Sequence, residues 1–80
     1  MRIFDVDNDQ ALSNVVLYLK NEEAKELLDS LTSLIGDGDF SAHSHITDLE
    51  FEHELTVVLY DEQKMDSLNE RSKKIILTDT

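Results

Sequence analysis

The chain has 80 residues, of which 40% are hydrophobic, and its 18 acidic residues oppose seven basic ones for a net charge of -11. This length suits one domain, and the apolar content exceeds that of a disordered tail, so we expect a single acidic domain over residues 1–80. The charge disfavours direct binding to nucleic acid or to an anionic membrane, because both require basic side chains that neutralise phosphate.

The sequence contains no cysteine. Disulfides, thiolate zinc sites and a cysteine nucleophile are therefore excluded. Small secreted domains usually depend on disulfides, so the composition favours a cytoplasmic protein. The longest apolar runs, such as residues 15–19, are much shorter than a signal peptide core or a membrane span.

The first half of the chain predicts two short strands followed by a helix. Residues 2–6 and 12–19 are rich in β-branched and aromatic residues, and the turn-forming residues 7–9 lie between them. Residues 22–35 carry apolar side chains three and four positions apart, which is typical of a helix, with Asn21 as the expected N-cap. The apolar stripe of this helix consists of Ala24, Leu27, Leu28, Leu31, Leu34 and Ile35.

The second half predicts two further strands and a second helix. Residues 41–47 and 50–60 are the expected strands, joined by a turn at residues 48–49. The last helix is expected to run from Glu62 to Ile76, with Asp61 as its cap. One face of the longer strand would carry Phe51, His53, Leu55, Val57 and Leu59.

This order of elements, ββαββα, predicts an α+β fold. A small antiparallel sheet of three to four strands would bury the apolar stripes of two helices packed on one of its faces. The core is then expected to consist of Leu27, Leu28, Leu31, Leu55, Val57 and Leu59.

The three histidines are the candidates for a metal site. His43 and His45 alternate, so they project from one face of a strand, and the turn after them would bring His53 alongside. Three imidazoles with a water molecule suit zinc. However, His53 lies on the apolar side of its strand, where a core histidine is the simpler interpretation. We therefore expect no metal and no cofactor, and acidic neighbours would favour the protonated imidazoles.

No catalytic motif is present in the sequence. A nucleophile elbow, a P-loop and a dinucleotide fingerprint are all missing, and a chain this short rarely encloses a substrate-sized pocket. We therefore expect that the protein is not an enzyme and has no catalytic or cofactor-binding residues.

The acidic residues gather in the middle of the chain. Residues 21–60 hold ten acidic residues and one lysine, a net charge of -9, whereas residues 61–80 hold five acidic and four basic residues. One face of the strand predicted at 50–60 changes from acidic to apolar, a mixture typical of an interaction surface. The predicted partner-binding residues are Glu50, Glu52, Glu54, Val58 and Tyr60.

The expected function is a small acidic interaction module that docks on a basic surface of a partner protein. The composition is similar to that of small accessory proteins of bacteria and their phages, including inhibitors that mimic nucleic-acid charge. The docking module is expected to act as an inhibitor, an immunity-type protein or a regulator, and the resemblance assigns no residue a role. The alternatives are a homo-oligomeric structural protein, most simply a homodimer, and a histidine-based zinc-binding or zinc-sensing domain. The charge would also keep a small protein soluble without any partner.

Overall fold

The computed structural model describes residues 1–37, 43–48, 50 and 52–80 and divides the chain into two compact units. The first unit comprises Met1–Leu17 and Asp66–Thr80, and the second comprises Tyr18–Met65. In chain order the elements are β1 (Ile3–Asp5), β2 (Gln10–Leu12), α1 (Asn21–Asp37), β3 (His43–Thr47), β4 (Glu54–Val58) and α2 (Glu70–Thr78).

The predicted α+β class and the order ββαββα are confirmed. The described strands form two separate antiparallel sheets, β1–β2 and β3–β4, and not the predicted single sheet of three to four strands. Each sheet belongs to a different unit, and each unit contains one helix. That both helices pack on one face of a single sheet stays a prediction. Neither helix in the described residues is long and apolar enough to cross a membrane.

The first unit begins with the β1–β2 hairpin, in which Phe4 lies opposite Ala11. The predicted turn between the strands is confirmed. The Asp5 carboxylate accepts hydrogen bonds from the backbone N–H of Asn8 at 3.3 Å and from its side-chain amide at 2.7 Å. Asp9 adopts a left-handed φ of 52°, which aspartate tolerates better than most residues.

The second strand is shorter than predicted, because β2 ends at Leu12 and residues 13–20 form no helix or strand. The apolar side chains of residues 15–19 remain between 42% and 92% exposed. A high β-propensity expresses how well a side chain packs on a half-buried sheet face. Because the side chains of residues 15–19 are exposed, their propensity is not sufficient to form a strand.

Helix α2 begins eight residues later than the predicted start at Glu62. Its N-cap is Asn69, whose side chain accepts a hydrogen bond from a first-turn N–H at 2.7 Å. The predicted cap, Asp61, instead forms a turn and accepts a backbone N–H two residues further on at 2.9 Å. Asp and Asn are equally good caps, so cap preference alone does not distinguish the two sites.

Two arginines link α2 to the N-terminal part of the first unit. Arg2 donates from Nε to the carbonyl oxygen of Ile75 at 2.9 Å, near the negative end of the helix dipole. Arg71 donates to the Asp9 carboxylate at 2.6 Å, and its guanidinium lies 4.5 Å from the centroid of the Phe4 ring. Ile75, on the same helix, is buried.

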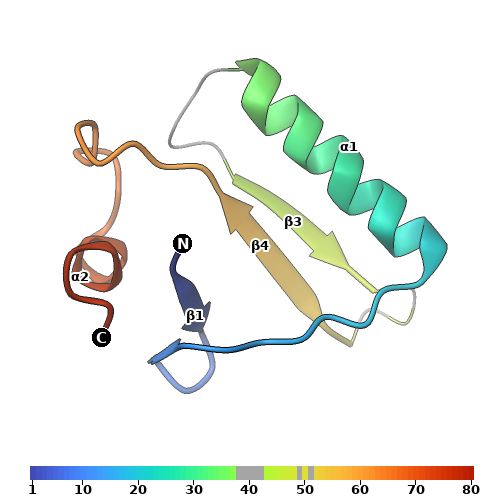
Figure 1. Ribbon diagram of the computed structural model, residues 1–80, viewed down its shortest axis with the longest axis horizontal. Helices are drawn as coiled ribbons and strands as arrows, with labels where there is room; N and C mark the ends of the chain where they lie inside the picture. Colours follow the sequence, from blue (N-terminus) through green and yellow to red (C-terminus); the bar gives the residue numbers. More distant parts are fainter. Residues whose placement is uncertain (38–42, 49, 51) are drawn as a thin grey trace. The chain divides into compact units, whose positions relative to one another are not determined.

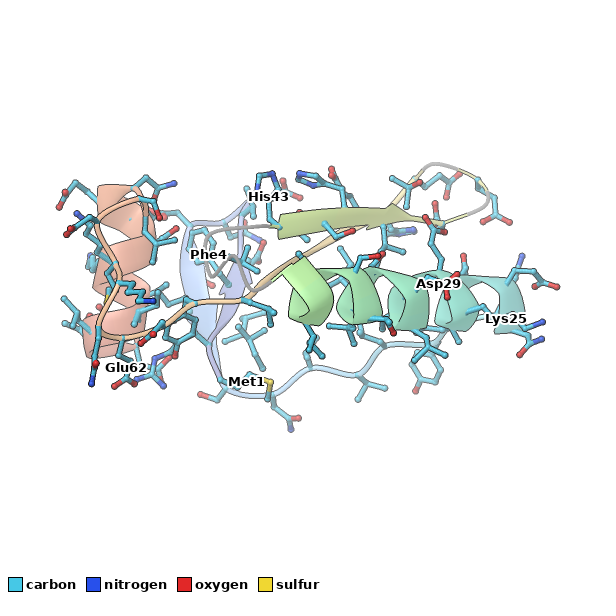
Figure 2. All side chains as sticks on the ribbon, turned by 90° about the horizontal axis from the view of Figure 1, so that it is seen from above. Met1, Phe4, Lys25, Asp29, His43 and Glu62 are labelled. Carbon is cyan, nitrogen blue, oxygen red and sulfur yellow. The ribbon has the colours of Figure 1, made fainter. Side chains whose placement is uncertain are left out.

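The second unit is a β3–β4 hairpin with α1 against one face of its sheet (Figures 1 and 2). The register places Ile46 opposite Leu55. The strand predicted at 41–47 is confirmed over 43–47, and residues 41 and 42 lie outside the described residues.

β4 is shorter than the strand predicted at 50–60, because the Asp48 side chain accepts hydrogen bonds from the backbone just before it. The Asp48 carboxylate accepts hydrogen bonds from the N–H groups of Glu52 at 2.7 Å and His53 at 3.2 Å. Bonds of this kind compete with the ladder of a sheet, so the chain forms a turn here.

Helix α1 confirms the helix predicted at 22–35, but its cap position is Lys20 and not Asn21. The first helical hydrogen bond runs from the N–H of Ala24 to the carbonyl oxygen of Lys20 at 2.9 Å. The buried Glu23 accepts the N–H of Lys20 at 2.8 Å, which is one half of a capping box.

The buried stripe of α1 is narrower than the predicted one. Leu34 and Ile46 are the most deeply buried hydrophobic residues of the second unit, at 4% and 5% exposure. Leu28 and Ile35 are 63% and 68% exposed, so placing Leu28 in the core was wrong. A helix over two strands contacts the sheet along one narrow line, which leaves the flanks of its apolar stripe uncovered. Leu27, Leu31, Leu55, Val57 and Leu59 are half-buried, and Phe51 lies outside the described residues.

Candidate functional site

The face of the β3–β4 sheet opposite α1 carries the candidate site. Successive side chains of a strand point to opposite faces, so alternate residues of β3 and β4 project there. Figure 2 shows His43 on this side of the sheet, away from α1. We call its exposed residues the outer sheet face: His43, His45, Glu54, Thr56 and Val58.

His45 is the centre of the polar contacts on the outer sheet face. Its Nδ1 lies 2.6 Å from Oε1 of Glu54 and 2.9 Å from Oγ1 of Thr56. The register explains both contacts, because Thr56 is directly opposite His45 and Glu54 is its diagonal neighbour. The His43 ring meets the His45 ring edge-on, with centroids 5.0 Å apart. The contact with Glu54 is an ion pair only when the imidazole is protonated.

His53 lies in the turn before β4 and not beside the other two histidines. Its Nδ1 is 2.6 Å from Oδ2 of Asp48, and its side chain is exposed, so its placement on the apolar side of a strand was also wrong. The structure therefore does not assemble the predicted triad of His43, His45 and His53. Across residues 1–37, 43–48, 50 and 52–80, no group of three or more His, Asp or Glu side chains is arranged to hold a metal ion.

The contact between Asp48 and His53 shifts the pKa of both groups. The hydrogen bond from the imidazole lowers the pKa of the Asp48 carboxyl, and the two backbone N–H donors act in the same direction. The same hydrogen bond and the carboxylate charge raise the pKa of the His53 imidazole. Each group therefore favours the charged form of the other.

We expect this pair to make stability depend on pH. A raised histidine pKa stabilises the fold below the ordinary value of 6.5, and this contribution is lost as pH rises through the folded value. A lowered aspartate pKa stabilises the fold above the ordinary value of 3.8, and this contribution is lost as pH falls through the folded value. Both contributions are present between these two pH values. The urea midpoint of the wild type should therefore fall more between about pH 6 and about pH 8 than the midpoint of His53→Gln does.

Asp48→Asn tests the other member of the pair, because it keeps an oxygen acceptor for the two backbone N–H groups and removes the charge. It should show the same weakened dependence between pH 6 and pH 8 as His53→Gln. Equal dependence in the wild type and both variants would contradict the stabilising role of the pair.

The structure divides the predicted partner-binding residues among three places. Glu54 and Val58 share the outer sheet face, where Val58 is 43% exposed. Glu50 and Glu52 precede β4 and have exposed side chains. Tyr60 follows β4 and is half-buried. The acidic end and the exposed apolar residue of the predicted surface therefore belong to one hairpin.

Sequence patterns missed Lys20 as a neighbour of this surface. Its Nζ lies 3.2 Å from Oε1 of Glu50, and the hydrogen bond and charge of that carboxylate raise the pKa of Lys20. The two residues are 30 positions apart, so no local spacing signals the contact. The contact between His45 and Thr56 follows from the strand register, which the sequence pattern did not provide.

The second unit as a whole carries a strongly negative charge. The second unit, Tyr18–Met65, contains twelve acidic residues and three lysines, a net charge of -9. On α1 the side chains of Glu22, Glu26 and Asp29 are exposed. The field of this unit therefore attracts cationic surfaces.

No protein-family model, curated protein or solved structure is significantly similar to the chain. The geometry and charge of the described residues are therefore the basis for a proposed function.

Proposed function

We propose that the protein is an acidic docking module that binds a basic surface of a partner protein, as an inhibitor, an immunity-type protein or a regulatory accessory protein. The observation that supports this most directly is the outer sheet face, where acidic Glu54 and exposed, apolar Val58 lie on the same side of β4. The carboxylates of Glu50 and Glu52 extend the acidic end, and Tyr60 follows the apolar end.

The two ends of this surface have different physical roles in binding. Carboxylates at the edge of an interface act mainly through long-range attraction, which speeds encounter. Apolar side chains that become buried act mainly by slowing dissociation. Lys20 offsets part of the charge of Glu50, so Glu52 and Glu54 are the better tests of attraction.

The kinetic prediction separates these roles. The double variant Glu52→Gln/Glu54→Gln keeps the side-chain shapes and removes two charges, so association should slow several-fold and depend less on salt. Val58→Ala keeps the charges and should speed dissociation by up to about tenfold if its methyl groups are buried in the complex. A partner captured from the native host would be measured by surface plasmon resonance at two salt concentrations.

The matched control is Glu22→Gln/Glu26→Gln, which removes the same charge from the exposed side of α1. It should slow association less than the double variant at the hairpin. Binding that is independent of salt and unchanged by Glu52→Gln/Glu54→Gln would refute the acidic-docking mechanism, even for a genuine partner.

A further inference from the structure

Among the described strands, none pairs with the outer edge of β4. Within the described residues β4 pairs only with β3, and α1 packs mainly against β3. Glu54, Thr56 and Val58 are all exposed along this edge. A two-stranded sheet is marginally stable by itself, and an unpaired strand presents a row of N–H and C=O groups to any extended chain.

The hydrogen-bond pattern of the hairpin shows which backbone groups point outward. The N–H of Asp48 donates to the carbonyl oxygen of His53 at 3.2 Å, which is one of the two bonds of a hydrogen-bonded pair and places this pair in that phase of the ladder. In an antiparallel ladder such pairs alternate with non-hydrogen-bonded pairs. Thr56, opposite His45, therefore belongs to a non-hydrogen-bonded pair. The short distance of 2.9 Å between Thr56 Oγ1 and His45 Nδ1 agrees, because side chains approach more closely in such pairs.

By the same alternation, the N–H and C=O groups of Glu54, Thr56 and Val58 point away from β3. These residues also place their side chains on the outer sheet face. A strand added at this edge would therefore bond to their backbones and set its own side chains beside theirs.

The charge of the β3–β4 region favours a basic partner segment over a second copy of β4 at this edge. The residue opposite Glu54 would be basic and the residue opposite Val58 would be apolar, and these two positions are four residues apart in the added strand. A second copy of β4, paired antiparallel about Thr56, would instead set Glu54 opposite Val58. It would also bring two units of net charge -9 together, which repel each other.

We propose that β4 accepts an extended partner segment, with a basic and an apolar residue four positions apart, as a third strand of the β3–β4 sheet. This inference rests on the proposed acidic docking function and specifies how the partner is held. Main-chain hydrogen bonds supply affinity, while Glu54 and Val58 supply selectivity.

The test uses Thr56→Pro and its matched control, Thr56→Val. Both variants lose the hydroxyl contact with His45, but only proline removes the outward N–H. Proline is tolerated on an edge strand when its N–H faces solvent, so the hairpin should persist, which circular dichroism checks. The probe is a capped nine-residue peptide with lysine at position 3, valine at position 7 and threonine or serine elsewhere. A second peptide with lysine and valine three positions apart places them on opposite faces.

Binding of the first peptide, followed by NMR titration, should weaken about tenfold or more in Thr56→Pro and less than about threefold in Thr56→Val. In the wild type, the peptide should slow hydrogen exchange at the amides of Glu54, Thr56 and Val58 relative to the free protein. The second peptide should bind more weakly. Exchange in the wild type provides the test if Thr56→Pro does not fold.

The failures are distinguishable. Strand addition would be overturned if Thr56→Pro and Thr56→Val bound the first peptide equally well and the peptide added no amide protection in the wild type. If that binding were still sensitive to salt, the docking function would stand. Binding of neither peptide, or binding that Glu52→Gln/Glu54→Gln does not change, would count against both. Protection of the same three amides at high protein concentration without peptide would assign the edge to a second copy and overturn the proposal.

Discussion

Replacing Leu34 with alanine should lower the free energy of unfolding by about 2–5 kcal/mol. Leu34 is the least exposed hydrophobic residue among those described, and it lies on the helix that packs against β3. Truncation removes buried apolar surface and leaves a cavity that the short hairpin cannot fill completely. Small domains have a total stability of about 5–15 kcal/mol, so the variant should show a large fall in its urea midpoint.

Leu28→Ala is the matched control for this prediction. It makes the same chemical change in the same helix, so the helix propensity changes equally. Because Leu28 is mostly exposed, we expect a change within about 0.5 kcal/mol. Equal destabilisation by both variants would show that α1 packs by a different face from the one described.

Ile75→Ala should cause a loss of similar size, about 2–5 kcal/mol, through the first unit. Ile75 is the buried residue of α2, and its carbonyl oxygen accepts the hydrogen bond from Arg2. The substitution leaves that backbone acceptor in place and removes only the packed side chain. Leu77→Ala, at an exposed position of the same helix, is the control and should change stability by about 0.5 kcal/mol or less.

Ile75 and Leu34 belong to different units, so their variants also test the predicted single domain. In one cooperative domain, each variant lowers the unfolding midpoint of amides in both units by the same amount. Residue-resolved NMR during urea unfolding measures this directly. Two transitions, with each variant affecting only its own unit, would contradict the single domain.

Local chemistry within the sequence was sufficient for the element order and for several of the elements. The spacing of apolar residues over 22–35 predicted α1, because a helix presents every third or fourth residue on one face. The turn before β2 followed from side chains that bond to their own backbone, as Asp5 does. The acidic character of the β3–β4 region also needs no tertiary information, since charge is a property of the residues themselves.

Tertiary structure decided every feature that depends on a partner distant in the chain. Residues 13–20 have the composition of a strand but pair with no strand among the described residues, and Leu28 belongs to an apolar stripe that the narrow sheet does not cover. His45 contacts Thr56 because the register of β3 and β4 sets the two residues opposite each other, whereas His53 lies in the turn before β4. The sequence by itself thus determined the elements that are stabilised within a few residues. Burial, strand register and side-chain pairing were decided by the fold, because their energies arise between residues that only folding brings together.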